Sequence, residues 1–126
     1  ADYRAEKIHY EKIKKSDQDL ELRLVRNPDI VSEVSQKKRP QDVVIGFAAQ
    51  SSDLEHHAKN KMEKKQLDMI VGNLVHQEQK GFGNVHNDFY LLTKSNHQWC
   101  KNMGKDQVAK AILDEIENLI EAKLHS

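Results

Sequence analysis

The stretch VVIGFAAQSSDLEHHAKNKMEKKQLDMIV, residues 43–71, decides the fold. Its uninterrupted apolar run at 43–49 is typical of a parallel strand that is covered on both faces. The polar SSD segment at 51–53 supplies residues that favour a helix N-terminus, and residues 54–66 are predicted to be helical. The LDMIV run at 67–71 indicates a second buried strand. A strand, a helix and a strand in this order predict a βαβ crossover, and therefore an α/β layered sheet.

The sequence before this stretch predicts a further strand and a further helix. Residues 1–18 are polar and lack periodicity, which predicts a loop. Leucines occupy alternate positions over 20–25, which predicts a strand with one buried face. Residues 27–29, Asn-Pro-Asp, then predict a helix with Asn27 as its N-cap and Pro28 in its first turn, ending at residues 37–40. The apolar stripe of this helix consists of Ile30, Val31 and Val34. The order strand–helix–strand–helix–strand then predicts two crossovers in one sheet.

The sequence after residue 71 predicts a loop, a hairpin and a closing helix. The loop is HQEQKGFGN at 76–84. Two strands are predicted at 88–93 and 97–101, and Lys94-Ser95-Asn96 joins them in a hairpin. Residues 105–124 form an amphipathic helix whose apolar positions recur at helical spacing. Those positions are Val108, Ile112, Ile116, Leu119 and Ile120.

Composition limits the possible partners. The 126 residues are enough for one domain, and no linker or repeat is visible over 1–126. Lys and Arg number 20, as do Asp and Glu, so the absence of a basic excess argues against nucleic acid and against a membrane surface. No apolar run approaches the roughly 18–20 residues of a membrane span. The single cysteine, Cys100, excludes a disulfide within the chain and fits a reducing, cytoplasmic location.

One segment is locally basic. Residues 59–65, KNKMEKK, carry four lysines and one glutamate, which fits a small anionic ligand. Lys61 and Lys65 are four apart on the predicted helix, which places their Cβ atoms about 5–6 Å apart on one face. A di- or triphosphate would offset the repulsion between them, although both side chains can equally point into water. Gly46 would let the backbone approach a ligand, and Phe47 could pack against a base or ribose, or lie in the core.

Other motifs are weak. The N–H groups that begin the predicted helix at 27–31 can meet an anion or a base carbonyl, or be capped in the ordinary way. GFGN at 81–84 does not have the dinucleotide pattern, and there is no GxxxxGK[ST], so any nucleotide binds in a nonstandard way. The seven histidines contain no zinc-binding pair at helical spacing, and the metal ligands of the chain stay unknown. Neither Ser51-Ser52 nor Cys100 has the setting of a nucleophile.

Six segments in order resemble a known family. They are ADYR at 1–4, EKIKK at 11–15, LVRNPDIV at 24–31, VIGFAAQ at 44–50, AKNKMEKKQLDMIV at 58–71 and GFGNVHN at 81–87. Together they resemble the phosphopantothenate–cysteine ligase domain, the synthetase half of the bacterial coenzyme A biosynthesis flavoprotein. The resemblance covers nearly the whole chain, and its specificity lies in the joint order. It implies a Rossmann-like layered sheet with flanking helices, incomplete because the amino-terminal part of the family domain is absent.

The resemblance also implies a reaction. The carboxylate of 4'-phosphopantothenate attacks the α-phosphate of CTP, giving an acyl-cytidylate and pyrophosphate, and the amine of L-cysteine then displaces CMP. Mg2+ or Mn2+ accompanies the triphosphate, and FMN is expected only if a decarboxylase domain precedes the ligase in the parent polypeptide. The family enzyme is a homodimer. We therefore expect small-molecule substrates, a second copy of the chain as partner, no nucleic acid and no membrane.

Carried over by position, the resemblance implies a set of CTP contacts. They fall on Asp2, Lys12, Pro28, Asp29, Ile30, Val31, Phe47, Lys61 and Lys65. Lys12 is the catalytic lysine, which would neutralise phosphate charge as the acyl-cytidylate forms. Asp2 would take a ribose hydroxyl or a base amine, and the two lysines of residues 59–65 would hold the triphosphate. The turn at 28–31 would read cytosine with backbone groups.

The chain departs from the family pattern in three places. The glycine-rich amino-terminal segment, with an asparagine needed for turnover of the acyl-cytidylate, is absent, so we expect an incomplete active site and no activity from the chain alone. Gln50 replaces the glutamate of the family. Gly72-Asn73-Leu74 replaces its Ala-Asn-Asp. A non-catalytic nucleotide-binding or dimerisation module of the same fold is the alternative function, because a fold alone does not determine activity.

Overall fold

The computed structural model describes residues 2–8, 10–16, 18–75 and 88–125. The chain divides into two compact units, residues 1–30 and residues 31–126. The predicted loop at 76–84 and the GFGN motif within it lie outside the described residues.

The first unit is built around a two-stranded antiparallel ribbon. β1 (Tyr3–Ala5) pairs with β2 (Leu24–Arg26), and Tyr3 lies opposite Arg26. The prediction of a loop throughout 1–18 is therefore wrong at β1, and the strand predicted at 20–25 is reduced to the three residues of β2. Its predicted buried face is also wrong, because Leu20, Leu22 and Leu24 are each more than half exposed. The described residues of this unit provide no second layer to cover them.

Helix α1 (Ile30–Lys37) begins later than predicted. The backbone N–H of Asn27 donates to Asp2 O at 2.9 Å, so the strand pairing continues through Asn27 and this residue is not the N-cap. The predicted apolar stripe of α1 is wrong as a buried face, because Ile30, Val31 and Val34 are exposed. The buried residue is Ser35, whose hydroxyl donates to Gln66 O at 2.6 Å.

The second unit contains a four-stranded mixed sheet in the order β3-β4-β5-β6. Its strands are β3 (Ile45–Gln50), β4 (Met69–Leu74), β5 (Asp88–Thr93) and β6 (His97–Cys100). β3 and β4 are parallel and are joined through α2 (Leu54–Lys64), which confirms the crossover over 43–71. The crossover predicted between the strand at 20–25 and the strand at 43–49 is wrong, because β2 lies in the two-stranded sheet with β1. β5 and β6 form the predicted hairpin, and α3 (Lys105–Leu124) has its predicted bounds.

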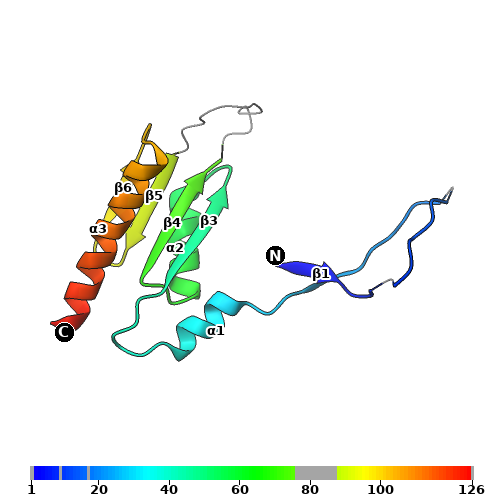
Figure 1. Ribbon diagram of the computed structural model, residues 1–126, viewed down its shortest axis with the longest axis horizontal. Coiled ribbons are helices and arrows are strands. Elements are labelled where there is room, and N and C mark those ends of the chain that lie inside the picture. Colours follow the sequence, from blue (N-terminus) through cyan, green and yellow to red (C-terminus); the bar gives the residue numbers. More distant parts are fainter. Residues whose placement is uncertain (1, 9, 17, 76–87, 126) are drawn as a thin grey trace. The chain divides into compact units, whose positions relative to one another are not determined.

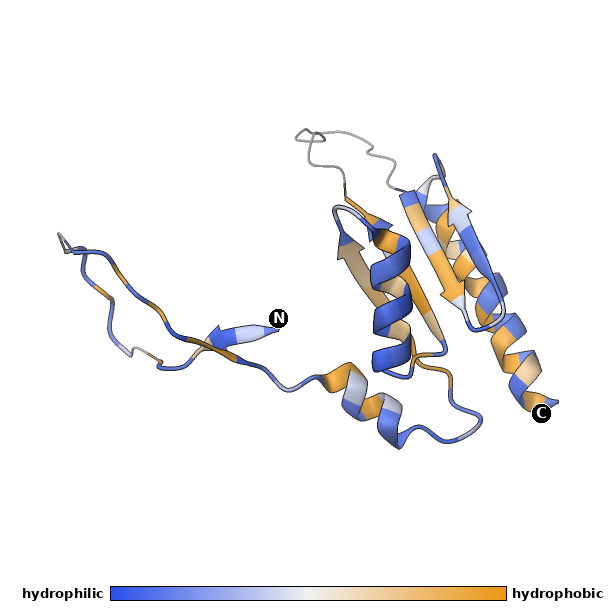
Figure 2. Cartoon of the chain, turned by 180° about the vertical axis from the view of Figure 1, so that it is seen from behind, coloured by the Kyte–Doolittle hydropathy of each residue, from blue (hydrophilic) through white to orange (hydrophobic). Residues whose placement is uncertain are grey.

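The two longer helices cover opposite faces of this sheet, α2 on one side and α3 on the other (Figure 1). Seen from behind, the outer side of α2 is hydrophilic and the strands beneath it are hydrophobic (Figure 2). The core cluster under α2 contains Ala48, Leu54, Ala58, Met62, Leu67, Ile70 and Tyr90. The cluster under α3 contains Met69, Val71, Leu91, Cys100 and Val108. This arrangement is the α/β layered fold that the sequence predicts.

Local details at the ends of α2 differ from the prediction. Asp53 lies at the N-cap position, but its backbone is left-handed (φ 50°, ψ 41°) and its side chain makes no capping bond. The helix ends at Lys64, and Gln66 has a left-handed φ of 54° instead of being helical. None of the helices in the described ranges combines the length and apolarity that a membrane span requires.

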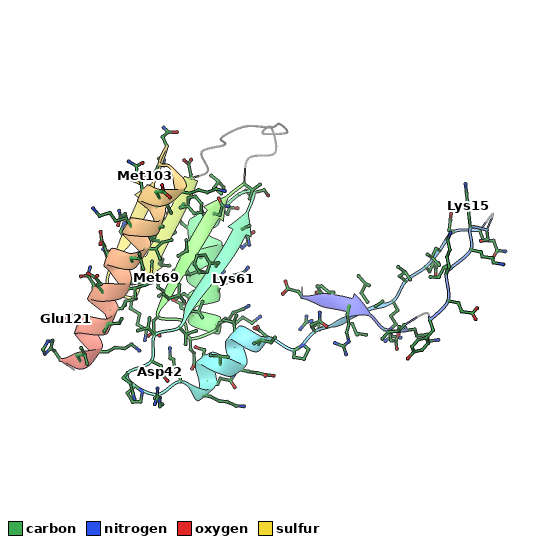
Figure 3. All side chains as sticks on the ribbon, in the orientation of Figure 1. Lys15, Asp42, Lys61, Met69, Met103 and Glu121 are labelled. Atoms are coloured by element: carbon green, nitrogen blue, oxygen red, sulfur yellow. The ribbon has the colours of Figure 1, made fainter. Side chains whose placement is uncertain are left out.

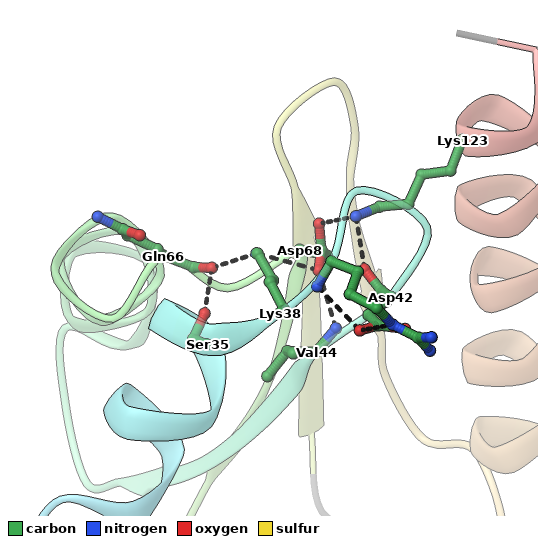
Figure 4. A network of polar contacts seen from close by, with 8 residues as sticks. Ser35, Lys38, Asp42, Val44, Gln66, Asp68 and Lys123 are labelled. Carbon is green, nitrogen blue, oxygen red and sulfur yellow. Dashed lines mark hydrogen bonds and ion pairs between the residues drawn. The ribbon is translucent and has the colours of Figure 1, made fainter.

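A buried polar junction ties several elements of the second unit together (Figure 4). The Asp68 carboxylate accepts from Val44 N at 2.8 Å, from Lys38 Nζ at 3.2 Å and from Lys123 Nζ at 2.9 Å. Lys123 Nζ also donates to Asp42 O at 2.6 Å. We call these five residues the Asp68 junction. They connect the end of α1, the entry to β3, the start of β4 and the last turn of α3.

Candidate functional site

The residue just before the predicted turn at 28–31 is anchored by its neighbours in the first unit. The Arg4 guanidinium donates to Arg26 O at 2.9 Å and to Asn27 Oδ1 at 3.0 Å. The backbone of Asp2 holds Asn27 N, as described above. The structure therefore brings Asp2 next to the turn that begins at Pro28. Sequence reasoning missed Arg4 as an anchor, although ADYR was one of the segments that carried the resemblance.

The predicted catalytic lysine lies in the extended part of the first unit. Lys12 is exposed, as are Lys14 and Lys15, so none of these lysines has a role in a core. Figure 3 shows Lys15 at the far end of this extended segment, away from β1. An exposed lysine can extend its ammonium group to an anion in solution, as a phosphate-binding side chain must.

Lys61 and Lys65 lie together at the C-terminal end of α2. The backbone N–H of Lys65 donates to Lys61 O at 2.9 Å, and both residues are half-buried. In Figure 3, Lys61 projects from α2 on the side of the sheet that ends in β3. The negative end of the helix dipole offsets part of the repulsion between two such ammonium groups. The two lysines therefore lie where the helix dipole favours positive charge.

Phe47 lies on the face of β3 opposite α2. Strand residues alternate between faces, and Ala48 packs in the cluster under α2, so Phe47 points to the α3 side of the sheet. Its side chain is 71% exposed, which removes the interpretation of Phe47 as a core residue. The expectation for Gly46 is wrong. A Cβ on Gly46 would lie 2.6 Å from Leu67 Cδ1, so this glycine permits close packing and not the approach of a ligand.

The structure therefore groups some predicted residues and separates others. Asp2 lies by the turn at 28–31, and Lys61 lies by Lys65. Phe47 is on the other face of the sheet from α2. The roles of the nine predicted residues therefore stay predictions.

A cavity that sequence reasoning did not identify lies where β3 ends and α2 begins. It has a volume of about 630 Å³ and is lined by Ser51, Ser52, Asp53, Leu54, Glu55, His56, Leu74 and Trp99. Trp99 Nε1 donates to Glu55 Oε1 at 2.8 Å and forms one wall. The SSD segment after an apolar strand was the available signal, because ligands in open α/β sheets bind beyond the carboxyl ends of strands.

The described residues contain no group of three His, Cys, Asp or Glu side chains that could hold a metal ion. They therefore do not fit a resident metal site, and we derive no step through a metal. Cys100 is buried, and burial raises the pKa of its thiol. A protonated, buried thiol is a poor nucleophile, which agrees with the sequence prediction for this residue.

Comparison with known proteins places this geometry in a family. Residues 1–120 match the family described as DNA/pantothenate metabolism flavoprotein C-terminal domain. The chain is 36% identical over 116 residues to the coenzyme A biosynthesis bifunctional protein CoaBC of Haemophilus influenzae, covering 92% of the chain and 29% of that protein. It is 38% identical over 120 residues to the CoaBC of Bacillus subtilis, covering 94% of the chain and 29% of that protein.

A solved structure agrees with these relatives. The crystal structure of the C-terminal domain of a coenzyme A biosynthesis bifunctional protein CoaBC superposes with a TM-score of 0.71 at 26% identity. The alignment covers 96% of this chain and 50% of the solved one. The chain thus spans less than a third of the length of the curated relatives and half of the solved domain.

Proposed function

The chain belongs to the DNA/pantothenate metabolism flavoprotein C-terminal domain family, and from that membership we propose that it is the nucleotide-binding part of a CTP-dependent phosphopantothenate–cysteine ligase. The observation that carries the proposal is the family match, which runs through both units of the chain. The relatives that it matches are named for coenzyme A biosynthesis. We place the reaction in the cytoplasm, and we assign FMN only to a decarboxylase domain elsewhere in a parent polypeptide.

The proposed reaction has two steps. A carboxylate oxygen of 4'-phosphopantothenate attacks the α-phosphorus of CTP, a P–O bond forms, and the bond to pyrophosphate breaks. The amine of L-cysteine then attacks the acyl carbon, loses a proton and releases CMP. Because negative charge must be brought together in the first step, cationic side chains near the phosphates lower its barrier. Mg2+ or Mn2+ would enter with the triphosphate, since divalent cations in such sites are bound largely by substrate phosphates.

Different residues of the chain would bind different parts of CTP. Lys12 supplies a charge at the reacting phosphate, and Lys61 and Lys65 hold the triphosphate from the end of α2. The turn at 28–31, which follows the Asn27 bound by Arg4 and Asp2, offers backbone groups to the cytosine. The exposed ring of Phe47 offers a stacking surface. What supports these roles is the exposure of Lys12 and Phe47 and the pairing of the two lysines on one helical turn.

The first test is calorimetric titration of CTP and Mg2+ into the full-length protein and into this chain, with ATP as a competitor. We expect Lys61→Ala/Lys65→Ala to lose CTP binding. Lys12→Gln should keep the fold and remove pyrophosphate release in the full-length protein. Lys110→Gln, an exposed lysine on α3, is the control and should change neither measurement. Normal pyrophosphate release by Lys12→Gln would refute the role assigned to Lys12. CTP binding that persists in Lys61→Ala/Lys65→Ala would show that α2 does not hold the triphosphate.

The second candidate function, a dimerisation module, is favoured by the first unit. Its exposed large apolar side chains are Tyr3, Ile8, Tyr10, Ile13, Leu20, Leu22, Leu24 and Ile30. So many apolar groups in a short ribbon mark a surface that another chain covers. We propose that this surface joins two copies into a homodimer. Light scattering should report a dimer that Leu22→Lys dissociates and that Ile120→Lys on α3 leaves intact. A monomeric wild-type protein would contradict this proposal and leave the ligase proposal standing.

A further inference from the structure

A second cavity lies on the α2 side of the sheet, between the C-terminal half of α2 and the end of β5. Its volume is about 660 Å³, within the range of roughly 300–1,000 Å³ that is typical of small-molecule sites. Its lining residues all belong to the second unit, and none of them is among the nine residues to which we assign CTP contacts. It also shares no residue with the cavity at the end of β3.

The inner part of this cavity is apolar. Met62 and Leu67 are buried in the core cluster under α2, and Leu92 packs against that cluster. The chain reverses direction at the end of α2, where Leu67 N donates to Met62 O at 3.0 Å, so these two side chains lie together. We call the three residues the apolar floor. Unfilled space above apolar side chains forfeits dispersion contacts, so an apolar group that occupied it would regain them.

Three lysines from separate parts of the chain line the same cavity. Lys38 follows α1, Lys59 lies on α2, and Lys94 lies in the turn between β5 and β6. Lys38 is paired with Asp68. The exposed ammonium groups of Lys59 and Lys94 form no ion pair or hydrogen bond with any residue that the structure describes. They are therefore available to an acid that enters the cavity.

The walls that carry these lysines are held in place. Lys38 Nζ donates to Gln66 O at 2.6 Å, which ties the end of α1 to the turn after α2 (Figure 4). The turn with Lys94 is closed by two hydrogen bonds, Thr93 N to Asn96 O at 2.9 Å and Asn96 N to Thr93 Oγ1 at 3.0 Å. A ligand would thus meet a largely formed site, which lowers the entropic cost of binding.

Lysine ammonium groups repel metal ions, and a long polyanion needs a basic surface that extends beyond one cavity. The combination of apolar floor and lysines suits a small molecule with an acidic group at one end. We propose that this cavity binds a small amphipathic anion, whose carboxylate or phosphate faces Lys59 and Lys94 and whose apolar part lies against the apolar floor. This inference is independent of the proposed ligase activity.

The test uses octanoate as the probe and octanamide as its uncharged match, with the full-length protein labelled with ¹³C at the methionine methyl groups. Met62 lines the cavity, whereas Met69 and Met103 pack under α3 and report on the other face of the sheet. The Met62 resonance is the one lost in Met62→Leu. We expect octanoate to shift this resonance in a saturable way and to leave that of Met69 unchanged. Octanamide should bind more weakly, and added salt should weaken only octanoate.

The charge requirement is tested with a double variant and a matched control. Lys59→Gln/Lys94→Gln should raise the Kd for octanoate about fivefold to tenfold and leave the Kd for octanamide unchanged. Its unfolding midpoint should stay that of the wild type, because both side chains are exposed. Lys105→Gln/Lys110→Gln removes two exposed lysines from α3 instead, with the same loss of net charge, and should leave octanoate binding unchanged.

Four results would overturn the inference. The first is the absence of a saturable Met62 shift with octanoate, and the second is an equal affinity for octanamide. The third is an equal effect of the two double variants, which would attribute binding to the net charge of the protein. The fourth is displacement of octanoate from Met62 by CTP, which would make the cavity part of the nucleotide site. Failure of the ligase assays would leave this inference standing.

Discussion

The Asp68 junction leads to the most direct stability prediction, the substitution Asp68→Ala. This change leaves two ammonium groups and the Val44 N–H without their shared acceptor. Burial alone would raise the pKa of Asp68, but hydrogen bonds from Val44 N, Lys123 and Lys38 together hold it below the ordinary value of 3.8. The folded chain therefore stabilises the carboxylate form, and removing that carboxylate should destabilise the fold.

The magnitude follows from the burial of the partners. Breaking a fully buried ion pair by removing one member costs about 3–5 kcal/mol. Here the Asp68 side chain is 10% exposed and those of Lys38 and Lys123 are 21% exposed, so water recovers part of the lost interaction. We expect a loss of about 2–4 kcal/mol in the free energy of unfolding. For a domain of this size that corresponds to a fall in the midpoint on the order of 10–20 °C.

The assay is thermal and urea unfolding of the chain, followed by circular dichroism. The control is Asp42→Ala, whose carboxylate pairs at the surface with Arg39 at 2.9 Å. Hydrogen bonds from Arg39 lower the pKa of Asp42 to about 2, yet exposed pairs contribute little to stability. A midpoint shift for Asp68→Ala no larger than that of Asp42→Ala would refute the reasoning.

The same junction predicts a pH dependence. Because the folded-state pKa of Asp68 is lowered, its contribution is complete above the unfolded value near 3.8 and is lost as the pH falls through the lower folded value. The difference in unfolding free energy between wild type and Asp68→Asn should therefore be constant near neutral pH and should shrink below about pH 4. A difference that grows on acidification would contradict this assignment.

The remaining predictions concern packing, the turn and the thiol. Gly72→Ala should destabilise the fold by about 1–3 kcal/mol in urea unfolding, because its Cβ would lie 2.6 Å from Leu54 Cδ1 and 3.0 Å from Leu54 Cγ. Arg4→Ala should raise the KM for CTP severalfold in the full-length protein without lowering the unfolding midpoint of the second unit, because it removes the hydrogen bond to the Asn27 side chain just before the turn. Cys100 should react with a thiol reagent only on unfolding, because burial raises its pKa.

Each of these three has a clear contradicting result. Gly104→Ala, whose Cβ would meet nothing within 4 Å, is the control for Gly72→Ala, and equal effects would argue against the packing explanation. An unchanged KM for CTP in Arg4→Ala would show that the hydrogen bonds of Arg4 do not support nucleotide binding. Rapid labelling of Cys100 in the folded chain would show that the thiol is accessible after all.

Much of the second unit follows from local pattern. α3 and β5 have their predicted bounds, because an amphipathic helix and an apolar strand carry their periodicity within their own residues. The crossover over 43–71 follows for the same reason. The proximity of Lys61 to Lys65 was also predictable, since helical pitch alone brings residues four apart onto one face.

The alternation at Leu20, Leu22 and Leu24 shows where local pattern fails. It predicts a buried face, but burial depends on a second layer, and the described residues of the first unit have none. The apolar stripe of α1 is likewise not a buried face. The buried side of this helix is the one that carries Ser35, which bonds to Gln66.

The sequence by itself determined the layered core of this protein and the residue types that a phosphate ligand needs, because periodicity and charge are local properties of the chain. Only the tertiary structure decided which face each side chain occupies. It placed Phe47 on the face of the sheet opposite α2 and packed Gly46 against Leu67. It also brought Asp68 to two lysines distant in sequence, since such contacts depend on how elements pack and not on the pattern within any one of them.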